Sequence, residues 1–115
     1  MNYLQEIYIY ASKGEQFTCH IISTNNAPPF SAESLTFDPQ INAIFSSLHP
    51  IGTQYQTAID AYEEIIKYCV KYTRAKNIRI TKIDNPCNAP FISKADQQAV
   101  VNQNNLSITV LVNGQ

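Results

Sequence analysis

Residues 53–76, TQYQTAIDAYEEIIKYCVKYTRAK, hold the clearest periodicity in the chain and decide the predicted fold. At about 100° per residue the apolar side chains fall on one face and the charged side chains on the other, which predicts an amphipathic helix of about 22 residues. Glu63 and Lys67 form an i,i+4 pair in the favourable orientation. The expected inner face consists of Tyr55, Ala58, Ile59, Tyr62, Ile65, Ile66, Cys69 and Thr73.

A β-hairpin is predicted at the N-terminus. Residues 3–24, YLQEIYIYASKGEQFTCHIIST, alternate between two sets of side chains on either side of a glycine turn. A three-residue turn at residues 13–15 pairs Ile7 with Ile21, whereas a two-residue turn pairs Ile7 with His20. Side chains that lie opposite each other share a face, so we expect the three-residue turn, which keeps the apolar set together.

Between the hairpin and the long helix the pattern weakens. Residues 25–40 contain two adjacent prolines and predict a long irregular connection, because proline cannot join a regular ladder of backbone hydrogen bonds. We expect a short helix that begins at Pro39 with Asp38 as its N-cap. The sequence HPIG at residues 49–52 then predicts a break.

After the long helix, residues 77–84 predict a strand with an irregularity near Lys82. Residues 93–104 predict a short helix capped by Ser93, and residues 106–112 predict a final strand. The order is β-β-(α)-α-β-(α)-β. It predicts a single α+β domain over the whole chain, in which a sheet of about four strands (the N-terminal hairpin plus two later strands) packs on the one long helix.

Composition excludes several classes of function. The chain is 15% charged with a net charge of −1 and scattered basic residues, so we expect no nucleic-acid binding. It holds no apolar run of about 18 residues and no visible signal peptide, so we expect no membrane contact. Three cysteines without a CxxC pair suit a reduced, cytoplasmic setting. Scattered cysteines and histidines predict no metal site, and the glycines form no nucleotide loop, so we expect no cofactor.

Cys87 is the main catalytic candidate, in the loop IDNPCNAPFIS at residues 83–93. A cysteine nucleophile needs exposure, a lowered pKa and a nearby base, for which His49 or His20 is available. No motif surrounds these residues. We therefore interpret Cys87 as a turn residue and the protein as a non-enzyme.

Tyrosine is the more informative residue type, with seven copies in a chain that has no tryptophan. Tyrosine combines a large contact area with a polar tip and is enriched at interfaces. The alternative is that these tyrosines lie at the edge of the core under a loop. The residues that we predict to form an interface are Tyr8, Tyr10, His20 and Ile22 on the outer hairpin face, Tyr68 and Tyr72 on the helix flank, and Phe30 in the proline-rich connection.

These observations predict a small intracellular accessory protein that acts by protein–protein interaction, as inhibitors, immunity proteins and adaptors do. We expect it to self-associate, most simply as a dimer. Two alternatives stay open. A pocket between the long helix and the sheet, or at an oligomer seam, would bind a small molecule. A cysteine-dependent enzyme would use Cys87.

Overall fold

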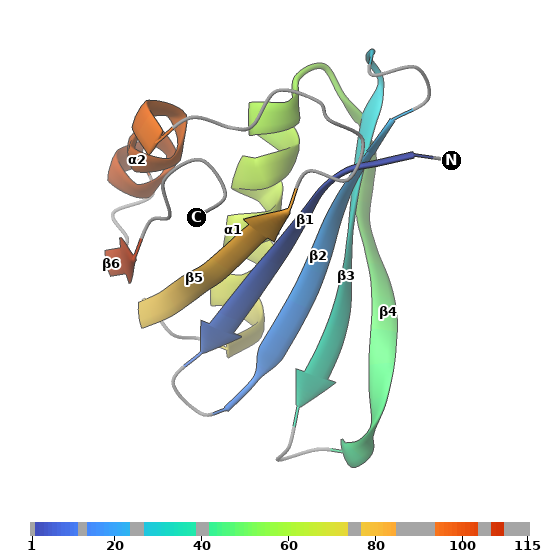
Figure 1. Ribbon diagram of the computed structural model, residues 1–115, viewed down its shortest axis with the longest axis vertical. Coiled ribbons are helices and arrows are strands. Elements are labelled where there is room, and N and C mark those ends of the chain that lie inside the picture. Colours follow the sequence, from blue (N-terminus) through green and yellow to red (C-terminus); the bar gives the residue numbers. More distant parts are fainter. Residues whose placement is uncertain are drawn as a thin grey trace.

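The computed structural model describes residues 2–11, 14–23, 27–38, 42–73, 77–84, 94–103 and 107–109. Within these ranges the chain forms an α+β domain with one sheet in the order β4-β3-β2-β1-β5-β6 (Figure 1). Neighbouring strands are antiparallel, except that β6 runs parallel to β5. The elements are β1 (Asn2–Ala11), β2 (Gln16–Ser23), β3 (Phe30–Asp38), β4 (Asn42–Tyr55), α1 (Ala58–Thr73), β5 (Asn77–Asp84), α2 (Lys94–Gln103) and β6 (Ser107–Thr109).

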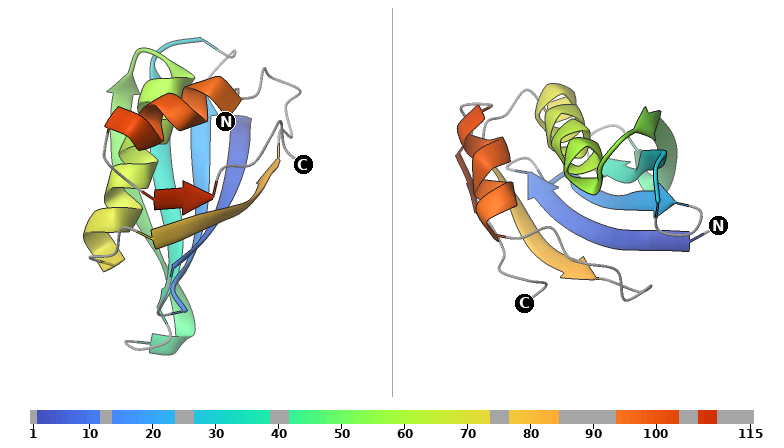
Figure 2. Two further views of the ribbon diagram at one scale, coloured as in Figure 1. Left: turned by 90° about the vertical axis from the view of Figure 1, so that its left-hand side faces the viewer. Right: turned by 90° about the horizontal axis from the view of Figure 1, so that it is seen from above.

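The core lies between the sheet and α1, and α2 lies beside α1 near the β5–β6 end of the sheet (Figure 2). Burial of these apolar side chains supplies the main driving force for folding. None of the described helices combines the length and apolar character that a membrane span requires. The buried cluster includes Ile7, Ile9, Phe17, Cys19 and Ile21 from the hairpin, Ala61, Tyr62, Ile65, Ile66 and Cys69 from α1, and Val100 from α2.

The N-terminal hairpin has the predicted faces but not the predicted register. Ile7 lies opposite Cys19 and not opposite Ile21. Each side chain stays on its expected face, because a shift by two residues preserves the alternation of a strand. The turn closes one residue earlier: the Gly14 N–H donates to the Ala11 carbonyl over 3.1 Å, and Gly14 has a φ of 91°. Glycine adopts this positive φ readily, so its place in the turn helps to set the register.

Two strands replace the irregular connection and the short helix that the sequence predicts before α1. Residues 30–38 form β3 and residues 42–55 form β4, so the helix expected from Pro39 is wrong. The predicted break at residues 49–52 lies inside β4, and the described sheet has six strands instead of about four. Pro50 is tolerated there because β4 is an edge strand.

The reason that β3 escapes prediction is the unusual polarity of its two faces. Ala32, Ser34 and Thr36 are buried on the side of α1, whereas Leu35 is exposed on the opposite side. Since α1 packs over β3 and β4, small side chains on β3 leave room for the rings of the helix. The alternation of large apolar with polar residues that identifies a half-buried strand is therefore absent.

The amphipathic helix is confirmed, with shorter bounds than predicted. It spans Ala58–Thr73, and Thr57 caps it: the N–H of Asp60 donates to Thr57 Oγ1 over 3.1 Å. Tyr55, which the sequence placed on the inner helix face, ends β4 instead. Its ring packs against Gly52, where a Cβ atom would come within 2.6 Å of a ring carbon.

The C-terminal elements lie where the sequence predicts them. The pairing of β5 with β1 shifts register between Lys82 and Ile80, which confirms the expected irregularity. The helix α2 and the start of the last strand are also confirmed. Ser93 and residues 110–112 lie outside the described residues, so their predicted roles stay predictions.

Candidate functional site

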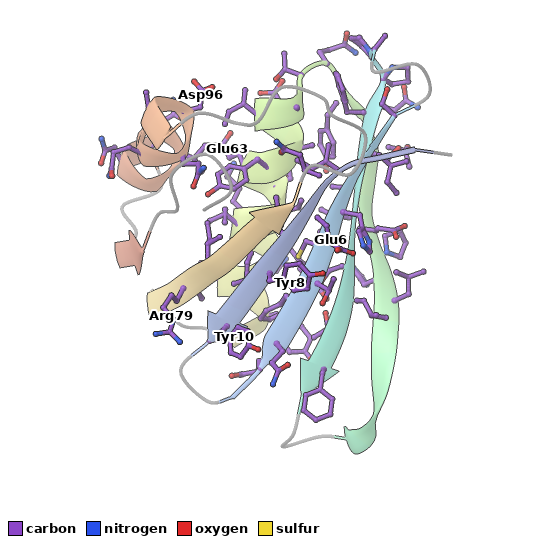
Figure 3. All side chains as sticks on the ribbon, viewed as in Figure 1. Glu6, Tyr8, Tyr10, Glu63, Arg79 and Asp96 are labelled. Atoms are coloured by element: carbon purple, nitrogen blue, oxygen red, sulfur yellow. The ribbon has the colours of Figure 1, made fainter. Side chains whose placement is uncertain are left out.

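One face of the sheet is covered by the helices, and no described element covers the other, which we call the open face (Figure 3). Strand pairing orders the side chains of the open face into rows that run across the strands, among them three rows between Gln16 and His20 of β2. The ion row is Glu6, His20, Glu33 and Pro50, the middle row is Tyr8, Thr18, Leu35 and Leu48, and the third row is Arg79, Tyr10, Gln16 and Phe37.

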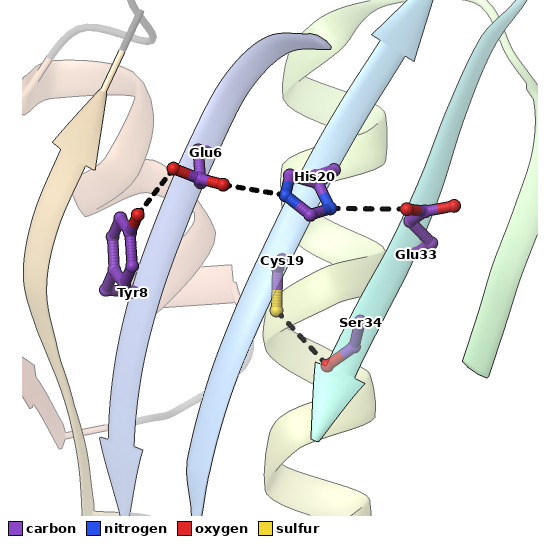
Figure 4. Close-up of polar contacts among 6 residues, drawn as sticks. All are labelled: Glu6, Tyr8, Cys19, His20, Glu33 and Ser34. Atoms are coloured by element: carbon purple, nitrogen blue, oxygen red, sulfur yellow. Dashed lines mark hydrogen bonds and ion pairs between the residues drawn. The ribbon is translucent and has the colours of Figure 1, made fainter. Parts of the chain in front are cut away.

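Direct contacts join three side chains of the ion row, Glu6, His20 and Glu33 (Figure 4). His20 Nε2 lies 2.9 Å from Glu6 Oε2, and His20 Nδ1 lies 3.2 Å from Glu33 Oε2. The Tyr8 hydroxyl donates to the other carboxylate oxygen of Glu6. Hydrogen bonds that an ionised carboxylate accepts are stronger than neutral ones, so these contacts tie β1, β2 and β3 together.

This arrangement lacks the geometry of a metal centre or a catalytic base. Each ring nitrogen of His20 faces a different carboxylate, so the three groups do not converge on one point. Among the described residues no group of three ligands is placed to hold a metal ion. The His20 side chain is only 9% exposed, and both of its nitrogens are engaged, so a substrate has little access to the ring. The ion row is therefore best understood as structural.

Apolar side chains dominate the exposed part of the open face. Leu48 is 62% exposed, Tyr10 41% and Leu35 39%, and Leu35 lies directly opposite Leu48 on the neighbouring strand. Two adjacent exposed leucines keep apolar area in contact with water. Covering that area with another surface would be favourable. The open face therefore carries an exposed apolar pair next to its polar rows.

The edges of the sheet are less suited to association than its open face. The edge strand β4 contains Pro50, and its pairing with β3 shifts register at three places. The opposite described edge, β6, is only three residues long. Proline, irregular pairing and short strands are devices by which natural sheets avoid edge-to-edge addition.

A second surface lies between α1 and β4, on the helix side of the sheet. It is a pocket of about 380 Å³, lined among the described residues by His49, Tyr68, Lys71 and Tyr72, and we call it the aromatic pocket. The His49 ring stacks on Tyr68 with a centroid distance of 4.8 Å and an interplanar angle of 13°. The Tyr68 and Tyr72 rings lie 6.0 Å apart, and buried Phe17 meets both edge-on. These arrangements are favourable for aromatic rings.

Polar side chains connect the core to the aromatic pocket. Cys19 Sγ lies 3.5 Å from Ser34 Oγ, Ser34 Oγ lies 3.1 Å from Thr36 Oγ1, and Thr36 Oγ1 lies 3.5 Å from the Tyr68 hydroxyl. Burial raises the pKa of the Tyr68 phenol, against the opposing effect of its hydrogen bond with Thr36. Burial also raises the pKa of the Cys69 thiol well above its usual value. Such a buried, protonated thiol is a poor nucleophile, which makes Cys69 a core residue.

The structure separates the residues that the sequence proposed for an interface. Tyr8, Tyr10 and His20 lie on the open face, whereas Tyr68 and Tyr72 meet at the aromatic pocket. The side chain of Ile22 is almost fully buried, and Phe30 packs in the core, so neither offers much contact area.

Of the catalytic candidates, only the two histidines lie among the described residues. Cys87 lies outside the described residues. His49, its candidate base, stacks on Tyr68, and His20 is held between two carboxylates. The described residues therefore do not test the cysteine-enzyme alternative, which stays a prediction.

Sequence reasoning missed the partners of His20 and the exposed leucines. Glu6 could have been placed on the outer face from the sequence, because it lies two residues before Tyr8 in the same predicted strand. Glu33, Leu35 and Leu48 had none, since the strands that carry them were not recognised.

No protein-family model matches the chain, and neither a curated protein nor a solved structure matches it. Function must therefore be argued from the site itself.

Proposed function

We propose that this chain is a small cytoplasmic accessory protein that acts by protein–protein contact, and that its open face binds a second copy of the same chain. One observation carries the proposal. Among the side chains whose exposure the structure describes, four large apolar ones are exposed, and three of these lie on the open face: Tyr10, Leu35 and Leu48. Exposed apolar groups that gather on one face are typical of interaction surfaces.

The extent of the open face suits a dimer. Figure 1 looks onto this face, and the whole molecule measures 38 by 29 Å along its two longest axes. Stable interfaces use about 800 Å² of each partner, so a dimer through this face would cover most of the sheet. Two sheets that pack face to face with aligned strands form a common and well-packed arrangement.

The distribution of charge favours a second copy as the partner and selects one orientation. The described charges on this face have opposite signs, with Glu6 and Glu33 in the ion row and Arg79 in the third row. A two-fold axis parallel to the rows, through the middle row, sets each ion row against the partner's third row. The middle rows then face each other and bury Leu35 and Leu48 twice. An axis along the strands would instead oppose carboxylates to carboxylates, which is unfavourable.

Sedimentation equilibrium and native mass spectrometry of the full chain test the proposal. We expect a dimer at micromolar concentration, and we expect Leu48→Arg or Tyr10→Arg to yield monomers. Tyr72→Arg is the matched control, because Tyr72 is the fourth exposed large apolar residue among those whose exposure the structure describes, and it lies on the helix side. Arg79→Glu sharpens the test of orientation, since it should weaken the dimer more than Arg79→Ala.

Two results would overturn the proposal. A chain that stays monomeric to several hundred micromolar does not bind its own copy. A dimer that Tyr72→Arg dissociates, but Leu48→Arg does not, associates through the helix flank. Circular dichroism of each variant verifies that the fold is retained.

A further inference from the structure

We infer that the aromatic pocket is a binding site for a small planar aromatic carboxylate, whose ring lies against the tyrosines and whose acid group faces Lys71. This site lies on the helix side of the sheet and is separate from the open face, so it does not depend on the proposed dimer. Three features carry the inference: ordered rings, an available cation and a matching size.

The rings of the pocket are held in place before any ligand binds. Tyr68 is stacked on one side by His49, contacted at its edge by Phe17, and joined at its hydroxyl to Thr36 over 3.5 Å. Tyr72 is 39% exposed, while Phe17 supports it edge-on at 5.6 Å. A surface of this kind binds a flat ring at low entropic cost, because few side chains must be ordered on binding.

The charge at the pocket is positive. Lys71 lines the pocket and is exposed, and no carboxylate of the described residues lies within ion-pair distance of it. Lys67, one turn earlier on α1, contacts Glu64 at 3.4 Å instead. A ligand that places an anion beside Lys71 gains an ion pair, whereas a cationic ligand meets repulsion. We therefore expect the ligand to carry an acid group beside Lys71.

The volume limits the size of the ligand. Binding pockets for small molecules span about 300–1,000 Å³, and the aromatic pocket, at about 380 Å³, lies at the lower end of that range. A ligand of one or two fused rings matches this volume. The class is therefore an aryl carboxylate of the size of benzoate or naphthoate.

The test is an NMR titration of the full chain with 2-naphthoate, and with 2-naphthalenemethanol as the neutral compound of the same shape. We expect saturable shifts of the tyrosine ring and His49 signals with a submillimolar Kd for naphthoate. The alcohol should bind about fivefold more weakly, which is the scale of one solvent-exposed ion pair. Lys71→Met should remove this preference for the acid, and Tyr72→Leu should weaken both compounds.

Lys67→Met is the matched control, since it removes a cation from the same helix but not from the pocket. The same titration on the Leu48→Arg variant separates this site from the open face, because that change leaves the pocket intact whether or not the chain dimerises. The inference is overturned if no saturable shift occurs below 5 mM ligand. It is also overturned if acid and alcohol bind equally, or if Lys67→Met lowers affinity as much as Lys71→Met. Unchanged backbone signals elsewhere confirm that the variants fold.

Discussion

The covered face and the open face belong to the same strands, yet they carry different kinds of side chain. The covered face buries Ile7, Ile9, Phe17 and Ile21 almost completely against α1. The open face alternates a row of paired charges with a row that ends in two exposed leucines. Stability therefore depends mainly on the covered face, whereas the open face retains apolar area that folding of the single chain does not bury. Each prediction below changes one side of this comparison.

The largest effect is expected on the covered face. Ile9→Ala should lower the free energy of unfolding by about 2–5 kcal/mol, because it removes a fully buried side chain and leaves a cavity. Leu48→Ala on the open face should change it by no more than about 0.5 kcal/mol in the monomer. Urea unfolding followed by circular dichroism measures both. Similar losses for the two variants would contradict the assignment of stability to one face.

The ion row is the part of the open face that should contribute to stability. His20→Ala should cost about 1–3 kcal/mol, because Glu6 and Glu33 are then left partly buried without their shared partner. Adding Glu33→Gln should recover part of the loss, since it removes the carboxylate charge that has lost His20 as its partner. Strictly additive losses would show that the three side chains do not act as a network. His49→Ala is the control, because its ring is exposed and makes no ion pair with a described residue.

The hairpin turn sets the register of β1 against β2. Substitution of Gly14 in this turn should have the next largest effect on stability. Gly14→Ala should cost about 1–2 kcal/mol, because an L side chain is strained at a φ of 91°. Gly14→Asn should cost less, since asparagine tolerates positive φ better than alanine does. Thermal unfolding compares the two variants. Equal melting temperatures for alanine, asparagine and glycine would remove the argument that Gly14 sets the register.

The smallest effect is expected at Tyr62, and it has the opposite sign. Its hydroxyl is buried and has no hydrogen-bond partner among the described residues, so Tyr62→Phe should leave stability unchanged or raise it by up to about 1 kcal/mol. A loss of more than about 1 kcal/mol would mean that the hydroxyl makes a stabilising hydrogen bond.

Tyr62 also predicts a dependence on alkaline pH. Burial raises the pKa of Tyr62 above its ordinary value of 10.0, so the unfolded chain ionises first. The native state then holds more protons than the unfolded state above about pH 10, and the free energy of unfolding falls as pH rises. Tyr62→Phe should reduce this fall, while Cys69, Tyr55 and Tyr68, whose pKa values burial also raises, preserve part of it. Urea unfolding at pH 8 and pH 10.5 gives the change in the free energy of unfolding for the unmodified chain and for Tyr62→Phe. The same change in both proteins would contradict the prediction.

Local patterns alone determined a large part of this protein. Amphipathic periodicity identified α1, and strand alternation assigned Ile7 and Ile9 to the buried face and Tyr8 and Tyr10 to the other. These features depend on side chains within a few residues of each other, so they can be read directly from the sequence.

Only the tertiary structure decided where β3 and β4 lie and which residues meet on the two faces of the sheet. The inner side chains of β3 are small because α1 packs over them, and no local sequence pattern indicates this packing. The contacts of His20 with Glu6 and Glu33, and of His49 with Tyr68, join residues from different elements. These contacts are set by the register of strand pairing across the sheet and by burial against α1. Both depend on parts of the chain that are far apart in sequence.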